Sequence, residues 1–230
     1  MEKVQKLLVS ELFLTIQGEG RRIGTSCVLL RLYGCSVQCK WCDSKFAWNK
    51  GEEYECLTVK QILRKIYKMK SADLFYLLVS GGEPLLQEGL LLELIDLLVR
   101  LNSKWQIEIE TSGVYQPIYH PNICYSVSPK LSNASPKFTN GYKHLSNYAS
   151  LKNTYFKFVV EKEEDFEEII KIVALNNISS DLVYISGQGK NDYELLETEQ
   201  WLFDFLPKYW PQFKLSTRLH IHLFGGERGK

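Results

Sequence analysis

Short apolar runs alternate with helix-like patterns along this chain. Residues 27–33 (CVLLRLY) and 74–79 (LFYLLV) are almost continuously apolar, which is typical of strands buried on both faces of a parallel sheet. Between them, residues 58–69 place apolar side chains on one helical face and begin with T-V-K-Q, the pattern of a capping box. This alternation predicts a mostly parallel sheet with right-handed crossovers.

The number of expected strands limits the kind of sheet that can form. We count about six parallel strands, too few for a closed eightfold barrel, and the connection between residues 110 and 123 is short for a helix. We therefore expect an α/β fold, a partial (open) TIM-like barrel with a reduced helical layer, in a single domain over residues 1–230. The other expected strands are 7–16, 105–110, 123–127, 155–160, 182–185 and 215–223, and the other expected helices are 84–101, 163–175 and 192–206.

Composition excludes several classes of protein. The formal charge is +1, and without a long basic run the chain has no electrostatic footprint for nucleic acid. We expect no membrane span, because no run of about eighteen apolar residues occurs. The first residues lack a secretory apolar stretch, and three of the six cysteines crowd one loop, so we expect a reducing cytoplasm rather than a disulfide framework.

The crowded loop carries Cys35, Cys39 and Cys42. A structural zinc site prefers four ligands, whereas three thiolates can hold a [4Fe–4S] cluster and leave one iron open to another ligand. Free thiols or half of an unusual zinc knuckle are the alternatives, and the spacing favours the cluster. The remaining cysteines are interpreted as ordinary: Cys27, Cys56 and Cys124.

Other polar features are ambiguous when each is taken alone. The Q-G-E-G sequence at 17–20 is a plain turn or a ligand-contacting loop. Arg31, inside an apolar run, needs an anionic partner in the protein or in a substrate. His220 and His222 would point the same way from the strand expected at 215–223; a structural role is favoured over a metal pair. The polar stretch 131–152 is predicted to be a functional or mobile loop.

Two motifs together resemble those of the radical S-adenosylmethionine (SAM) superfamily. They are the C-x-x-x-C-x-W-C sequence of residues 35–42 and the G-G-E-P sequence of residues 81–84, which follows the next buried strand. Further sequences are similar to those of the 7-carboxy-7-deazaguanine synthase family. These are I-Q-G-E-G at 16–20, Arg31, C-D-S at 42–44, Ser80, E-T-x-G at 110–113 and S-P-K at 128–130.

The resemblance implies a complete set of site residues. Cys35, Cys39 and Cys42 would hold the [4Fe–4S] cluster, and Ser44 would bind Mg²⁺ where some relatives have threonine. SAM would be bound by Gly82, Ser128, Pro129, Lys130 and Gln188. The substrate, 6-carboxy-5,6,7,8-tetrahydropterin, would be bound by Ile16, Gln17, Gly18, Arg31 and Ser80. Glu110 is a candidate catalytic residue and equally a structural carboxylate.

The resemblance also implies a reaction and partners. The reduced cluster would cleave SAM to a 5′-deoxyadenosyl radical, which would take hydrogen from the substrate, and the ring would contract with loss of ammonia. Flavodoxin or ferredoxin would donate the electron, and the enzyme would be a homodimer. A glycyl-radical-enzyme activase shares the cluster and G-G-E-P motifs, and a non-catalytic iron–sulfur or zinc module is the alternative from another class.

Overall fold

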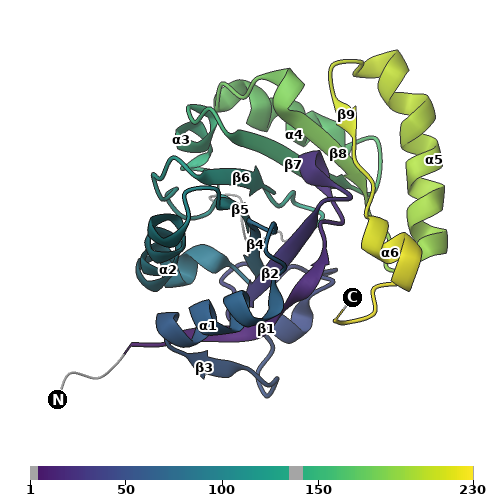
Figure 1. The fold of residues 1–230 in the computed structure, drawn as a ribbon. Coiled ribbons are helices and arrows are strands. Elements are labelled where there is room, and N and C mark those ends of the chain that lie inside the picture. Colours follow the sequence, from purple (N-terminus) through teal and green to yellow (C-terminus); the bar gives the residue numbers. More distant parts are fainter. Residues whose placement is uncertain (1–4, 135–141, 230) are drawn as a thin grey trace.

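The computed structural model describes residues 5–134 and 142–229, and its strands form one curved sheet (Figure 1). The strand order is β3-β1-β2-β4-β5-β6-β7-β8-β9. β1 pairs antiparallel with both β2 and β3, and every pair from β2 through β9 is parallel. The strands are β1 (Leu7–Ile16), β2 (Ser26–Leu32), β3 (Glu55–Leu57), β4 (Tyr76–Gly81), β5 (Gln106–Thr111), β6 (Ile123–Val127), β7 (Thr154–Val160), β8 (Val183–Gly187) and β9 (Lys214–Leu215).

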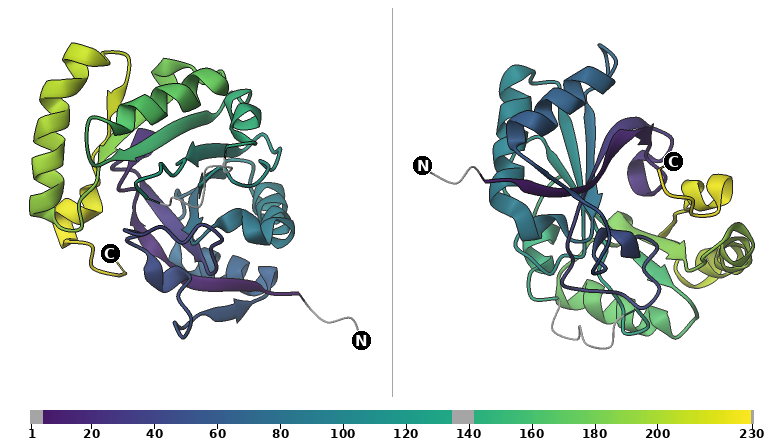
Figure 2. Two further views of the ribbon diagram at one scale, coloured as in Figure 1. Left: turned by 180° about the vertical axis from the view of Figure 1, so that it is seen from behind. Right: turned by 90° about the horizontal axis from the view of Figure 1, so that it is seen from below.

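Helices cover the outer side of this sheet, as the three views together show (Figures 1 and 2). Those on the outer side are α1 (Val59–Met69), α2 (Glu88–Leu101), α3 (Leu145–Ala149), α4 (Asp165–Leu175) and α5 (Asp192–Tyr209), whereas the short α6 (Leu219–Phe224) contacts α5 and contributes residues to the cavity described below. α1 begins at the predicted capping box: Gln61 N–H donates to Thr58 Oγ1 at 3.2 Å, and Thr58 N–H donates to Gln61 Oε1 at 2.8 Å. None of the helices in the described part of the chain is long and apolar enough to span a bilayer.

Alternation along the parallel strands separates an apolar outer face from an inner face that carries most of the buried polar side chains. On β5, Ile107 and Ile109 join the core under the helices, whereas Glu108 and Glu110 point to the other side. On β7, Phe156 and Phe158 lie in the same core, and Lys157 between them faces inward. The inner face of the open barrel carries polar and charged groups, among them Arg31, Ser80, Glu108, Glu110, Ser126, Tyr155 and Lys157. Beside them, β2 and β4 contribute a small buried apolar cluster of Cys27, Leu29, Tyr76 and Leu78.

The partial barrel predicted from the sequence is confirmed, with β2, β4, β5, β6, β7 and β8 as its six longer parallel strands. The reduced helical layer is also confirmed, because β5 connects to β6 through residues 112–122 without a helix. β3 was not predicted. The 131–152 prediction lies partly outside the described residues; the described remainder contains the short α3.

The strand predicted at 215–223 is wrong. Only Lys214–Leu215 is strand, and Leu219–Phe224 is the helix α6, which ends at Gly225 in the left-handed conformation with φ of 60°. Two residues apart on a helix, His220 and His222 do not share a face. Both nitrogens of His222 contact carboxylates of α5, those of Asp192 and Glu199, whereas His220 faces the cavity described below.

Candidate active site

A cavity of about 250 Å³ lies at the carboxyl ends of the parallel strands. Active sites of barrels collect at this end, because the loops that follow the strands converge there. The cysteine loop, the end of β4 with its glycine pair, the Q-G-E-G loop and the C-terminal residues 226–229 all contribute to its lining. Segments from both ends of the sequence thus meet at one site.

The cysteine loop contributes all three of its thiols to the cavity wall. Gln38 has a φ of 54°, which bends the loop between Cys35 and Cys39. Burial raises the pKa of both these thiols, and the Cys42 thiol adds to the effect, so the three sulfurs lie within electrostatic reach of one another. All three are free cysteines. This donor set fits a cluster that takes three thiolates from the chain.

The glycine pair holds the cysteine loop against the sheet. A Cβ at Gly82 would lie 2.1 Å from the carbonyl oxygen of Gly34, so only glycine lets the two backbones come this close. The next residue, Glu83, donates its N–H to the same oxygen at 2.7 Å. Glu83 is 1% exposed, and its carboxylate accepts hydrogen bonds from Ser112 N–H and Thr111 Oγ1 at 2.9 and 2.7 Å. The G-G-E-P segment therefore joins the cysteine loop to the end of β5.

Each residue of the Q-G-E-G loop has a defined neighbour. Gln17 donates its side-chain N–H groups to Glu108 and Glu110 on β5. The two glycines leave room for bulky side chains: a Cβ at Gly18 would lie 2.5 Å from His220 Nδ1, and one at Gly20 would fall on the Tyr155 hydroxyl. Two hydrogen bonds tie the loop to the segment 216–219: Gly20 N–H donates to the side-chain oxygen of Ser216, and Leu219 N–H donates to the Gly18 carbonyl.

Glu19, the acidic residue of the loop, lies in a cluster of charged side chains at the cavity. Lys157 forms an ion pair with it, and Arg218 Nε lies 3.4 Å from its carboxylate. Arg218 also donates to Asp43 Oδ2 at 2.6 Å and to the Gly189 carbonyl at 2.8 Å. Burial and the nearby Arg218 lower the pKa of Lys157 to about 7. One guanidinium thus joins the Q-G-E-G loop, the cysteine loop and the loop after β8.

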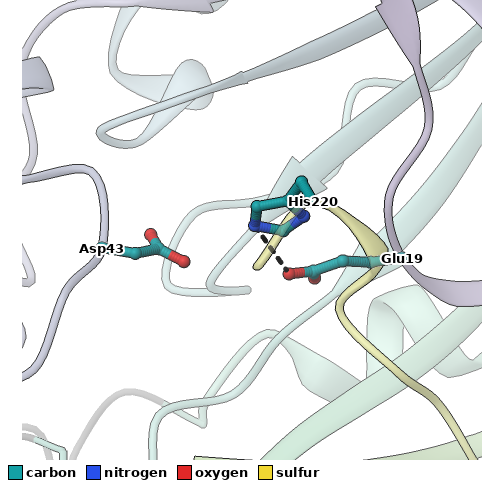
Figure 3. A group of neighbouring side chains, drawn as sticks. All are labelled: Glu19, Asp43 and His220. Atoms are coloured by element: carbon teal, nitrogen blue, oxygen red, sulfur yellow. Dashed lines mark ion pairs between the residues drawn. The ribbon is translucent and has the colours of Figure 1, made fainter. Parts of the chain in front are cut away.

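Glu19, Asp43 and His220 point toward one another, with ligand atoms all within 4.8 Å (Figure 3). Burial, with Arg218 and Lys157, lowers the pKa of His220 to about 4 despite the neighbouring Asp43. Arg218 already contacts both carboxylates, and a cation bound there would have to displace it. We therefore assign these three side chains to the ion-pair network rather than to a metal site.

Arg31 has an anionic partner within the protein, one of the two kinds of partner that the sequence left open. Its Nε donates to Glu11 at 2.9 Å and its Nη1 to Ser44 Oγ at 3.2 Å. The other oxygen of Glu11 accepts from Arg228 Nε at 2.8 Å, so the C-terminal segment closes over the same carboxylate. Phe46 lies between the two cations, 5.5 Å from the Arg31 guanidinium and 4.4 Å from that of Arg228.

Most residues predicted for the site line this cavity. The structure brings together there Ile16, Gln17, Gly18, Arg31, Cys35, Cys39, Cys42, Ser44, Ser80, Gly82, Glu110, Ser128 and Lys130. Pro129 and Gln188 are not among its lining residues, although Lys130 and Ser128 are bonded to each other beside Pro129. The sequence did not indicate Lys157, Arg218 or Glu11, whose partners are distant in sequence. It indicated His220 only together with His222, as a histidine pair on the strand predicted at 215–223, with a structural role favoured over a metal pair.

Comparison with known proteins gives this site a context. Residues 16–118 match the model of a family described as a 4Fe-4S single cluster domain. A protein named 7-carboxy-7-deazaguanine synthase from Pyrobaculum aerophilum is 33% identical over 233 residues, which cover 100% of both chains. The chain belongs to the 7-carboxy-7-deazaguanine synthase family. Its fold matches the crystal structure of QueE from Escherichia coli with a TM-score of 0.71 at 23% identity, covering 94% of this chain and 95% of that one.

Other proteins named 7-carboxy-7-deazaguanine synthase are similar to this chain over most of their length. The Rhodopirellula baltica protein of that name is 30% identical over 97% of this chain and 88% of its own, and the Escherichia coli protein 33% identical over 72% and 77%. The family predicted from the cysteine, glycine and Q-G-E-G motifs is therefore confirmed. Neither the activase nor the zinc module is favoured.

Proposed function

We propose that this chain is a radical SAM enzyme that converts 6-carboxy-5,6,7,8-tetrahydropterin to 7-carboxy-7-deazaguanine with loss of ammonia. One observation carries the proposal: the cysteine loop, the glycine pair and the Q-G-E-G loop line one cavity, in a chain that aligns over its full length with a relative of this name. The three motifs have a common explanation in this reaction.

The cofactors would occupy the side of the cavity formed by the cysteine loop. Cys35, Cys39 and Cys42 would ligate three irons of a [4Fe–4S] cluster, and when bound the cluster and SAM supply the one-electron chemistry that starts the reaction. The ammonium group of Lys130 lies near Cys39 and contributes positive charge there. The residues that would hold SAM are Gly82, Ser128, Pro129, Lys130 and Gln188.

The substrate would lie on the side formed by β1, β2 and the Q-G-E-G loop, against Ile16, Gln17, Gly18, Arg31 and Ser80. Arg31 is the natural partner for the substrate carboxylate. A guanidinium carries five N–H groups, and Arg31 uses only Nε and one hydrogen of Nη1 on Glu11 and Ser44. The N–H groups that remain can bind a carboxylate.

The Ser44 hydroxyl offers one oxygen ligand to Mg²⁺. The Ser44 hydroxyl donates to Asp43 Oδ1 at 2.9 Å and accepts from Arg31, which leaves one lone pair. Mg²⁺ takes few protein ligands and keeps water and substrate oxygens, so this donor set fits it. We propose that the ion, like Arg31, holds the substrate carboxylate.

Glu110 is the carboxylate that we propose for a role close to the reacting atoms. It lines the cavity and accepts from Gln17 Nε2 at 3.2 Å. A carboxylate held in this way can accept or return a proton as the substrate loses ammonia. We further propose one domain, a cytoplasmic location, a homodimer, and flavodoxin or ferredoxin as electron donor.

The proposal is tested by incubating the anaerobically reconstituted protein with SAM, a reductant and the tetrahydropterin. We expect a product lighter than the substrate by one ammonia, and none from the Cys35→Ala variant. Unchanged substrate with the wild-type protein, under conditions in which SAM is cleaved, would contradict the synthase function and favour an activase.

A further inference from the structure

A second glutamate lies directly beneath the cavity, on the inner face of β5. Glu108 is 0% exposed and does not line the cavity. Its Oε1 accepts from Gln17 Nε2 and from the Tyr155 hydroxyl, both at 2.9 Å. Its Oε2 has no hydrogen-bond partner, and the nearest cation, Arg22 Nε, is 3.8 Å away. A buried carboxylate is costly unless it is hydrogen-bonded or paired, so the bonds from Gln17 and Tyr155 are what hold Glu108 in this position.

All polar groups of Gln17 are used within the protein. Nε2 donates to Glu108 and Glu110, and Oε1 accepts from Glu19 N–H at 3.2 Å. The backbone N–H donates to the Thr25 carbonyl, and the backbone carbonyl accepts from Gly24 N–H, both at 2.8 Å. These bonds fix which way the side-chain amide faces. Gln17 therefore shapes the substrate side of the cavity instead of offering free polar groups to a ligand.

We infer that Glu108, held by Tyr155, is a positioning residue for the substrate side of the cavity, fixing the Gln17 amide and through it Glu110 and the Q-G-E-G loop. This inference rests on the proposed function. The Gln17 NH₂ group donates to both carboxylates. Because its bond to Glu108 fixes the position of this group, Glu108 also fixes the donor that Glu110 accepts from. Without Glu108 the amide loses one of its two acceptors and can rotate.

Tyr155 supports the loop in a second way, through packing. A Cβ at Gly20 would lie 2.3 Å from its hydroxyl, so the loop rests directly on this side chain. The hydroxyl also donates to Glu108. Tyr155 therefore limits how closely the Q-G-E-G loop can approach the sheet, and it also orients the Glu108 carboxylate. Burial, then repulsion from Glu110, raises the pKa of Glu108, as expected for two acids that share one donor.

Two tyrosines make a matched pair for the test. Tyr155→Phe removes the hydroxyl that bonds Glu108, and Tyr76→Phe removes a buried hydroxyl that has no hydrogen-bond partner and lies on the same inner face. We expect Tyr155→Phe to raise the Kd and KM for the tetrahydropterin about tenfold, the equivalent of about 1.4 kcal/mol, with the KM for SAM within twofold of wild type. Tyr76→Phe should leave both constants unchanged.

Glu108 itself is tested with a conservative rescue. Glu108→Ala removes the acceptor and should weaken substrate binding at least tenfold, whereas Glu108→Gln keeps an acceptor oxygen and should recover most of the loss. Equal substrate constants for the two tyrosine variants, or substrate and SAM constants that worsen together, would overturn the inference, and the tyrosine pair decides the matter if Glu108→Ala does not fold. An inactive wild-type protein would instead overturn the proposed function, and this inference with it.

Discussion

A methyl group added at Gly82 has no room in this structure. The new Cβ would lie 2.1 Å from the Gly34 carbonyl oxygen and 3.0 Å from Cys35 Cβ, whereas ordinary contact begins at 3.4 Å. The two backbones would have to separate by more than an ångström, which breaks the 2.7 Å bond from Glu83 N–H to that carbonyl. Overpacking costs about 1–3 kcal/mol, and the lost hydrogen bond adds about 0.5–1.5 kcal/mol.

Gly82→Ala should therefore lower the free energy of unfolding by about 2–4 kcal/mol. In a chain of this size the Tm should fall by roughly 4–16 °C. Because the displaced loop carries Cys35, iron bound per chain after anaerobic reconstitution should also fall at temperatures where the variant remains folded. The control is Gly89→Ala in α2, where a Cβ meets nothing within 4 Å; it should keep full iron and gain up to about 1 kcal/mol. Equal Tm and equal iron in the two variants would refute this reasoning.

Three further variants test contacts around the site. Glu83→Gln replaces one acceptor oxygen of a buried carboxylate by an NH₂ group that would face donors such as Ser112, and should lower the free energy of unfolding by roughly 1.5–3 kcal/mol, measured in urea. Arg218→Lys cannot reproduce a guanidinium that contacts Asp43 and two other acceptors, and should lower the same quantity by about 1–3 kcal/mol. For His222, burial alone would lower the pKa, but the two α5 carboxylates raise it overall. Its stabilising effect is therefore complete below about pH 6.5 and is lost as the pH rises through the raised pKa. The difference in Tm between wild type and His222→Gln should be largest at low pH and disappear at high pH.

Each of these expectations can fail in a specific way. A Glu83→Gln protein as stable as wild type would mean that its carboxylate is not the acceptor assigned here. An Arg218→Lys variant with an unchanged free energy of unfolding would mean that a lysine ammonium group can replace the Arg218 guanidinium. For His222, a Tm difference that grows with pH would reverse the sign of the argument; His220 does not interfere, because its pKa of about 4 keeps it neutral throughout this range.

The cysteine loop and the glycine pair were predictable because their chemistry demands particular residues at particular spacings. Three thiols in one short loop have few structural uses, and Gly81-Gly82 directly after a buried strand marks a close backbone approach. The alternation of apolar runs with amphipathic helices likewise predicts the parallel sheet, since both periods are set by local geometry.

The C-terminal segment was not predictable from local pattern. Residues 215–223 (LSTRLHIHL) alternate enough to suggest a strand, yet a six-residue helix forms there. Tertiary contacts decide the outcome: Leu219 N–H bonds the Gly18 carbonyl, and His222 contacts the carboxylates of α5. Short helices have little intrinsic stability, so packing rather than propensity selects them.

The charged network was not predictable for a related reason. Arg218 and Asp43 are separated by 175 residues, and nothing in the sequence near either one indicates the other. In the sequence, Glu108 is simply one polar position of an alternating strand. Only the curvature of the sheet places that face of β5 on the side of the cavity. Residues whose role depends on a partner distant in sequence can be identified only from the folded structure.

The most direct test of the account is the electron paramagnetic resonance spectrum of the reconstituted, reduced protein before and after SAM is added. Three cysteine ligands and one iron left open to SAM predict a [4Fe–4S]⁺ signal whose shape changes when SAM binds. A signal that SAM leaves unchanged, or a protein that retains zinc and gives no cluster signal, would contradict the account.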